Sequence, residues 1–174
     1  MRFDNQPFGR LSEILYDKAF TVHPYRHETI GSMEDLQAAT TQDVIDFHDT
    51  YYVPNNATVT IVGDFDTKDA QAMVQQYLAR VPKGKPVPRD IPKEPAQTAE
   101  RVFTMTEDWP LPAVIVAYHI APDATPDAYP THVLDKILGD GDSSRLYRSL
   151  VYEKRMALAA FATAKIIEHP NLFY

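Results

Sequence analysis

TTQDVIDFHDTYYVPNNATVTIVGDFD, residues 40–66, is the stretch of sequence that decides the fold. Thr40 followed three residues later by Asp43 is typical of a capping box and predicts the start of a helix. VPNNA ends that helix, and the β-branched run ATVTIVGDF predicts a strand. Asp66 then predicts the N-cap of a second helix. The first of these helices carries most of its apolar side chains on one face: Val44, Ile45, His48, Tyr51 and Tyr52.

Helical patterns also lie on both sides of this stretch. Ser32 and Asp35 predict a short capped helix, and the helix after Asp66 keeps its apolar spacing as far as Val81. Apolar residues at helical spacing predict three further helices. These are an amphipathic helix over about 8–20 (Leu11, Ile14, Leu15, Ala19), a helix opened by Asp127 and Pro130 and stopped by Gly139, and a helix through Leu146, Tyr147, Leu150 and Val151.

The second half of the chain also contains strand patterns, so the fold class is α+β. ERVFTMTED alternates, PAVIVAYHI is almost continuously apolar, and ALAAFATAKII resembles a further strand. Between the halves, five of the fourteen prolines fall within residues 82–95. Because proline fixes φ and removes a hydrogen-bond donor, this segment predicts an extended linker. The predicted domains are 1–81 and 98–174, joined by the linker 82–97.

The composition is that of an ordinary globular protein. The 174 residues have 44% hydrophobic residues and a formal net charge of −7, which argues against a nucleic-acid-binding protein. No apolar run approaches the roughly 18 residues of a membrane-spanning helix. MRFDNQPFGR has no apolar signal-peptide core, and the absence of cysteine excludes disulfides and thiolate metal sites. The first and last residues predict a piece of a longer protein.

HPYRHE, residues 23–28, contains the ligand types of a zinc site. His23 and His27 are four residues apart, as are the two histidines of the zinc motif H-E-x-x-H, and a glutamate, Glu28, follows them. Pro24 interrupts any shared helix, however, and Glu28 does not lie between the histidines. We therefore interpret the stretch as an ordered loop that holds no metal.

Other polar side chains also have simpler interpretations than a catalytic site. His48 on an apolar helix face and His119 after a buried strand are expected at the edge of the core. Asp140 and Asp142 of GDGDSS suggest calcium, but the further ligands of an EF-hand are missing. Ser143 and Ser144 are expected as helix caps, since no histidine is near them in sequence. The sequence therefore predicts no catalytic and no metal-binding residue in this chain.

Two long motifs resemble the M16 (insulinase/pitrilysin-type) zinc peptidases. HPYRHETIGSMEDLQAATTQDVIDFHDTYYVPNNATVTIVGDFD is similar to the segment after the family's catalytic region, and ILGDGDSSRLYRSLVYEKRMAL to the start of its next, inactive domain. The resemblance implies pieces of two α+β domains, each a mixed β-sheet with helices packed on one face. It also implies a non-catalytic part of a zinc metalloendopeptidase, which walls a chamber and holds peptide by pairing along a strand edge.

The family's catalytic motif is not in this sequence. M16 enzymes bind zinc through H-x-x-E-H, which is absent here, and the remaining glutamate ligand is expected just before Met1. Zinc is therefore implied for the parent protein and not for this chain. The family also places an arginine and a tyrosine in a pattern L-R-x-x-x-x-x-x-Y, which aligns here with Val151 and Leu158. Arg145 and Tyr152 have the right spacing but lie too early, so a second half or partner chain is expected to supply that pair.

Two alternative functions remain open from the sequence. A structural, non-peptidase subunit of the processing-peptidase or respiratory-complex core type would share the fold, and an unrelated calcium- or ligand-binding module would not. The apolar faces around Tyr77 and Phe173, which the parent would cover, are expected to be covered here by the two halves of the chain packing on each other or by a second copy of the chain. Resemblance to exported bacterial relatives suggests a periplasmic or secreted parent.

Overall fold

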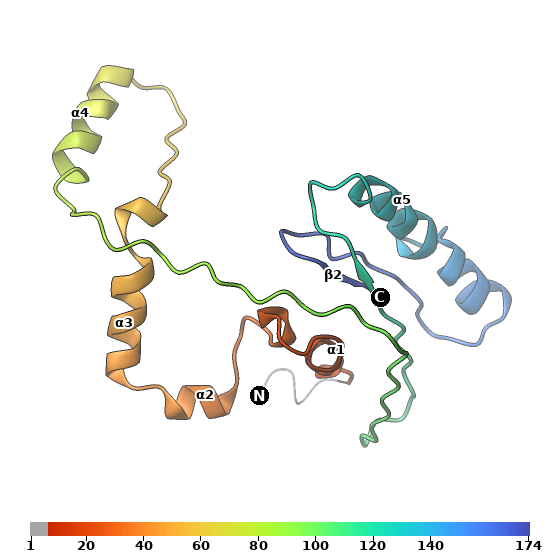
Figure 1. The fold of residues 1–174 in the computed structure, drawn as a ribbon. Helices are drawn as coiled ribbons and strands as arrows, with labels where there is room; N and C mark the ends of the chain where they lie inside the picture. The colour runs from red at the N-terminus through yellow and green to blue at the C-terminus, as the bar shows by residue number, and fades with distance from the viewer. Residues whose placement is uncertain (1–6) are drawn as a thin grey trace. The chain divides into compact units, whose positions relative to one another are not determined.

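The computed structural model describes residues 7–174, and the chain forms two compact units (Figure 1). The first unit combines the chain up to Glu28 with Lys93–Tyr174, and the second unit is Thr29–Pro92. The chain therefore passes between the units twice, after Glu28 and after Pro92. These units differ from the predicted domains because the segment around residues 7–28 groups with the second half of the sequence. The domain boundary at 82–97 remains a prediction.

The second unit consists of the helices that the capping patterns predict. Its elements are α2 (Met33–Ala38), α3 (Thr41–Tyr51), the 3₁₀-helix η2 (Pro54–Asn56) and α4 (Thr67–Tyr77). The Ser32 side chain accepts a hydrogen bond from the backbone N–H of Asp35, and Thr40 and Asp43 form the full capping box. The Asp66 carboxylate accepts from the first turn of α4. These local predictions are confirmed because each cap satisfies backbone donors that the helix itself leaves free.

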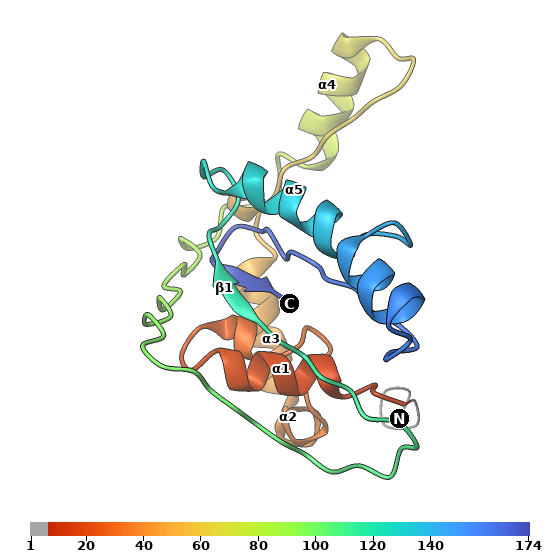
Figure 2. The ribbon, with the colours of Figure 1, turned by 90° about the vertical axis from the view of Figure 1, so that its right-hand side faces the viewer.

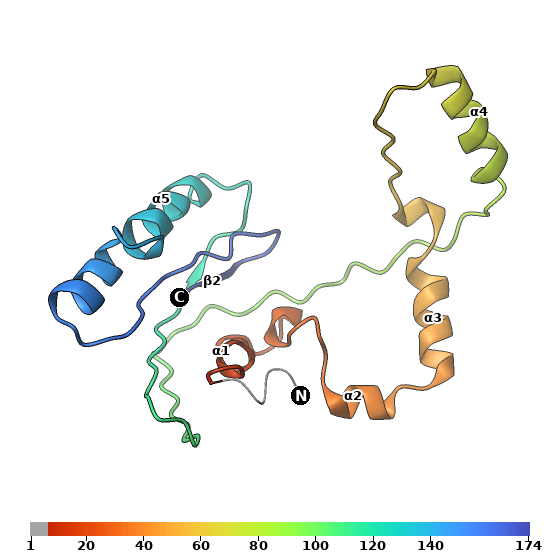
Figure 3. The ribbon, with the colours of Figure 1, turned by 180° about the vertical axis from the view of Figure 1, so that it is seen from behind.

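The segment 57–65 is extended but does not form the predicted strand. Figure 3 shows it as an open connection between η2 and α4. Val59, Ile61 and Phe65 line a shallow hollow together with Ala70 and Val74 of α4, so the segment lies beside that helix. A strand requires a second backbone to complete its ladder, and none pairs with this segment within residues 7–174. The β-branched run therefore predicts the extended conformation correctly and the sheet incorrectly.

The proline-rich segment is fastened to the VPNNA turn of the second unit. The Asn55 side chain accepts a hydrogen bond from the Gly84 N–H at 2.9 Å and donates to the Lys85 carbonyl at 3.2 Å. The Arg89 guanidinium donates to the Asn56 side-chain oxygen at 2.9 Å. Although most of its residues are exposed, the linker is held at these points.

We expect trypsin to cut the chain first in this linker, after Lys83 or Arg89, because exposed proline-rich chain is the easiest to open locally. Asn55→Ala should speed cleavage after Lys83 several-fold, since it frees the backbone of Gly84 and Lys85. Asn56→Ala is the control, because it frees the Arg89 side chain and the Tyr51 carbonyl but leaves the backbone of Gly84 and Lys85 held by Asn55. Timed digestion with mass spectrometry measures both rates. First cuts within residues 127–155 would contradict the prediction.

The first unit is α+β. Its helices are α1 (Leu11–Ala19), the 3₁₀-helix η1 (Pro24–Arg26), α5 (Ala128–Gly139) and the wider π-type helix η3 (Tyr147–Glu153). Its strands β1 (Tyr118–Ile120) and β2 (Asn171–Phe173) pair antiparallel, with His119 opposite Leu172 (Figure 2). The predicted helices over 8–20, from Asp127 to Gly139 and through Leu146–Val151 are confirmed in place.

The predicted strands of this unit are much shorter than expected. Within residues 7–174, only the last three residues of PAVIVAYHI form a named strand, and residues 100–117 are largely extended without a ladder partner. In ALAAFATAKII, Thr163 exchanges two backbone hydrogen bonds with Tyr174 and Lys165 donates to Leu172. The described sheet is therefore a small antiparallel one and not the mixed sheet expected, since pairing partners and not apolar content decide where a strand forms.

The core of the first unit lies around Phe20 and Leu172, which are both fully buried, with 1% of their surface exposed. Phe173 in β2 is also buried, so the expectation that it belongs to an uncovered face is wrong. Tyr77 in α4 is 57% exposed, as expected for an uncovered face. No helix in the described part of the chain is long and apolar enough to cross a membrane.

Candidate functional site

The residues of HPYRHE are used to build a loop, here called the 21–28 loop. His23 is the N-cap of η1, and its Nδ1 accepts a hydrogen bond from the backbone N–H of Tyr25 at 3.1 Å. Glu28 accepts a hydrogen bond from the Ser12 hydroxyl at 2.6 Å, whereas His27 is exposed. His23 and Glu28 are therefore engaged separately, and His27 joins neither contact. Among residues 7–174, no cluster of three or more histidine or carboxylate side chains could hold a metal ion, and this loop does not fit zinc.

His23 instead belongs to a buried aromatic cluster. Its ring centroid lies 4.3 Å from that of Tyr25, 5.2 Å from that of His169 and 5.9 Å from that of Phe20. The Nε2 atoms of His23 and His169 are both buried and have no hydrogen-bond partner in the described residues. Burial, then the neighbouring His169, lowers the pKa of His23, while Glu94 opposes that shift. The cluster therefore favours a neutral imidazole at position 23.

Glu94 fastens the beginning of the 21–28 loop. Its carboxylate accepts hydrogen bonds from the backbone N–H groups of Thr21, Val22 and His23 at 2.8–3.0 Å, and from the Thr21 hydroxyl at 2.6 Å. Burial by itself would raise the pKa of Glu94, but these four hydrogen bonds outweigh it and lower the pKa to about 2. This arrangement, the Glu94 clamp, is a binding site for a carboxylate that the chain fills with its own side chain.

Sequence reasoning missed Glu94 and His169. Glu94 lies in the proline-rich segment, 71 residues from His23, and His169 is still further along the chain. No spacing rule connects positions this far apart. The only signal available was that His169 and Asn171 directly precede the apolar end of the chain, where burial is expected.

The two histidines expected at the core edge lie in different surroundings. His48 is exposed, stacks on Tyr52 at 5.2 Å and lies 3.2 Å from the Asp49 carboxylate. The expected core-edge position is therefore wrong for His48, because α3 presents this face uncovered in the structure. His119 is largely exposed, but its ring meets Phe20 edge-on at 5.1 Å and its Nε2 lies 3.2 Å from the Ala19 carbonyl. His119 thus borders the core as predicted.

The GDGDSS turn does not form a cation site in the described chain. Asp140 pairs with Lys136 at 2.6 Å, and the turn depends on Gly141 in the left-handed region at φ 79°. Ser144 is buried with an unpartnered hydroxyl, and no side chain caps the start of η3. The expectation that Ser144 caps this helix is therefore wrong.

The positions aligned with the family's arginine–tyrosine pattern are unsuited to that chemistry. Val151 is half-buried in η3 together with Leu146, Tyr147 and Leu150, and Leu158 is 81% exposed. Neither aliphatic side chain can donate a hydrogen bond. Tyr152, the alternative with the correct spacing, is 76% exposed on the same helix.

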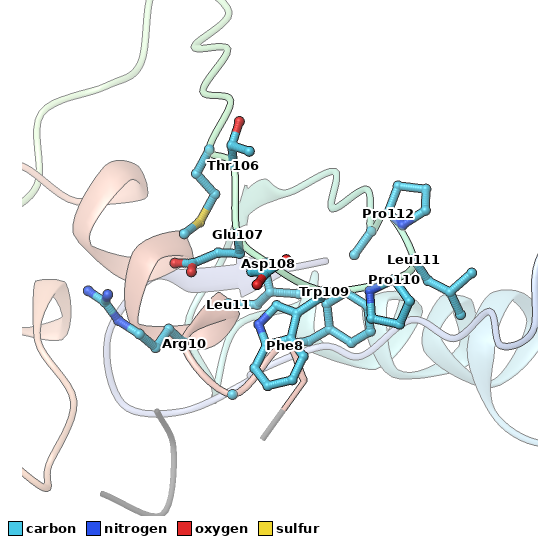
Figure 4. A pocket seen from close by; sticks show the side chains of 13 residues that line it. Phe8, Arg10, Leu11, Thr106, Glu107, Asp108, Trp109, Pro110, Leu111 and Pro112 are labelled. Atoms are coloured by element: carbon cyan, nitrogen blue, oxygen red, sulfur yellow. The ribbon is translucent and has the colours of Figure 1, made fainter. Parts of the chain in front are cut away.

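The first unit also contains a pocket of about 700 Å³ (Figure 4). Phe8, Leu11 and Trp109 supply apolar walls, and Arg10 and Glu107 supply charges of opposite sign. Its remaining wall is the extended segment from Met105 to Ala113. An apolar wall with a few charged side chains can receive a side chain of a bound molecule, but it does not bring a nucleophile and a base together.

Comparison with known proteins points to one family. The sequence model of the Peptidase M16 inactive domain matches residues 38–174. Zinc protease PqqE of Helicobacter pylori is 31% identical over 175 residues, which cover 99% of this chain and 39% of that protein. An uncharacterized zinc protease of Mycobacterium leprae is 25% identical over 170 residues, covering 94% of this chain and 37% of that protein.

Solved structures agree with these similarities. The crystal structure of a protease from Helicobacter pylori covers 99% of this chain with a TM-score of 0.84 and 31% identity. A peptidase M16 inactive domain from Pseudomonas fluorescens shares the fold with a TM-score of 0.71 and 21% identity. This chain spans 42% of each of those structures, so the similar proteins are more than twice as long.

Proposed function

Since this chain belongs to the M16 peptidase family, we propose that it is a non-catalytic wall of the peptide-holding chamber in a zinc-dependent metalloendopeptidase. The match of residues 38–174 to the inactive domain is the observation that carries this proposal. Relatives that resemble nearly the whole chain are named zinc proteases. Zinc ligands and the residues that activate water would come from parts of the parent protein outside these 174 residues.

The local structure supports a holding role and not a catalytic one. His23 uses Nδ1 as a helix cap and buries Nε2, so it is not available to a metal. Residues 100–117 are largely extended and exposed, and residues 105–113 within them line the pocket around Trp109. An extended backbone with free N–H and C=O groups is what an unfolded peptide needs to pair along a strand edge.

The oxyanion-stabilising pair would come from another part of the assembly. In the family pattern, an arginine and a tyrosine would steady the negative charge of the tetrahedral intermediate. Val151 and Leu158 occupy those positions here, so a second M16 half or a partner chain would provide the pair. The exposed apolar side chains of this chain, such as Tyr77, offer surface for that partner.

We expect Arg145→Ala and Val151→Ala in the full-length parent to change kcat per folded enzyme by less than about twofold, because neither residue touches the reacting atoms. Val151→Ala should lower the melting temperature, since Val151 is half-buried in η3. Steady-state peptide hydrolysis, with the folded fraction and the zinc content measured in parallel, checks the assignment.

Two outcomes would contradict parts of this proposal. A loss in kcat of about a hundredfold in Arg145→Ala, with normal folding and zinc content, would place Arg145 in the catalytic machinery. A parent that holds no zinc and hydrolyses no peptide would instead identify a structural M16-like subunit.

A further inference from the structure

The cap formed by His23 requires one protonation state of its ring. Because Nδ1 accepts a hydrogen bond from the Tyr25 N–H, Nδ1 carries no proton and the neutral ring carries its proton on Nε2. If Nδ1 gained a proton, it would become a donor facing the Tyr25 N–H, which is also a donor, and the hydrogen bond between them would be lost. The added charge would also lie among the rings of Phe20 and Tyr25, in a residue that is only 4% exposed.

Few nearby groups could compensate that charge. His169 faces His23 ring to ring, and its own Nε2 is buried without a partner. Glu94 is the nearest carboxylate, but its two oxygens already accept four hydrogen bonds. The other titratable or charged groups on the elements around the cluster are Glu13, Tyr16, Asp17 and Lys18 of α1, Tyr25, Arg26, His27 and Glu28 of the loop, Tyr118 and His119 of β1, Glu168 beside His169, and Tyr174.

We propose that His23 makes the 21–28 loop a pH-sensitive element, in which proton uptake from solvent at Nδ1 releases residues 24–28 while Glu94 keeps residues 21–23 in place. The two fastenings respond to different pH ranges. The cap on Tyr25 needs a neutral imidazole, whereas the Glu94 clamp needs an ionised carboxylate and survives to much lower pH. Mild acid therefore opens the second part of the loop and leaves the first part closed.

Besides the cap, the released part keeps two backbone hydrogen bonds of η1, to the carbonyls of His23 and Pro24, and the ring contacts of Tyr25. Its other side-chain contacts are weaker. Arg26 pairs with Asp17 at 2.8 Å, with both side chains at least one-third exposed, and such surface pairs contribute little to stability. Glu28 is held by the hydroxyl of Ser12. Since Glu28 is also the last residue before the second unit, its release lengthens one of the two connections between the units. The inference is independent of the proposed peptidase role.

The direction of the pH effect follows from linkage. Burial, followed by the charge of His169, lowers the pKa of His23 below its ordinary value of 6.5. The open loop therefore binds the proton at a higher pH than the closed loop does. As the pH falls below about 6.5, protons accumulate on the open form and the closed form loses population.

Amide hydrogen exchange of the 174-residue chain, followed by NMR and corrected for intrinsic rates, tests the proposal. Between pH 7.5 and pH 5 we expect the protection factor of the Tyr25 amide to fall about tenfold. The amides of Thr21, Val22 and His23 should keep their protection, because Glu94 still accepts their hydrogen bonds.

Two variants identify the titrating group. His23→Asn should abolish the pH dependence at Tyr25 and keep its protection, because an asparagine oxygen can cap the turn without titrating. His169→Phe should retain the pH dependence, since His23 is unchanged. The proposal is overturned if Tyr25 stays protected at pH 5, if Thr21, Val22 and His23 lose protection together with it, or if the response persists in His23→Asn or disappears in His169→Phe.

Discussion

Replacing Gly139 with alanine is expected to lower the free energy of unfolding by about 3 kcal/mol, at the upper end of the usual cost of overfilling a packed site. Gly139 ends α5 and is buried against Ala162. A Cβ atom at this position would overlap the backbone nitrogen of Ala162 and lie 2.5 Å from its Cα and Cβ. Since those are mostly backbone atoms, no side-chain rotation relieves the overlap. Urea unfolding monitored by circular dichroism measures the loss.

Gly141→Ala is the matched control for this prediction. Gly141 lies two residues further along, in the left-handed region at φ 79°, with open space where a Cβ would lie. Its replacement should cost only about 1 kcal/mol, from backbone strain. An equal or smaller loss in Gly139→Ala would mean that Ala162 and its segment move away freely.

Glu94→Gln is expected to destabilise the chain by about 2 kcal/mol at pH 7, because hydrogen bonds to a charged group are among the stronger ones. Glutamine keeps the shape of the side chain, but its NH₂ group replaces one carboxylate oxygen and cannot accept a hydrogen bond, so it loses either the N–H of Thr21 or those of Val22 and His23. The same unfolding measurement applies. Glu100→Gln, at an exposed position six residues along, is the matched control and should change stability by less than about 0.5 kcal/mol.

The Glu94 variant should also change the response to strong acid. The pKa of Glu94 lies near 2, below the ordinary 4.5, so the unfolded chain takes up this proton first as the pH falls. The wild-type chain therefore loses stability from about pH 4.5 to about pH 2. A full conversion of the shift gives about 3 kcal/mol, and we expect about half of that because the carboxylate is partly exposed and screened by solvent. An acid transition of equal size in Glu94→Gln would show that other carboxylates cause it.

The helices could be predicted because their signals are local. Ser32, Thr40 and Asp66 each bond to backbone groups two or three residues away, so the same few letters that suggest the cap also form it. The loop interpretation of HPYRHE is supported for the same reason, since His23 caps a turn within its own segment. The M16 family resemblance rests on ordered motifs along the chain and is confirmed by the inactive-domain match.

The strand pairing and the buried aromatic cluster could not be predicted from the sequence and were seen only in the tertiary structure. ATVTIVGDF has every local feature of a strand and is extended, yet a ladder depends on a second backbone that its own residues do not specify. The contacts of His23 with His169 and Glu94, and of Gly139 with Ala162, form only when distant parts of the chain fold together. The sequence by itself thus determined the caps, the helices and the family, because these are properties of neighbouring residues. Only the tertiary structure decided which distant groups shift the pKa of a side chain and which distant residues pack against each other. Both effects depend on separation in space and not along the chain.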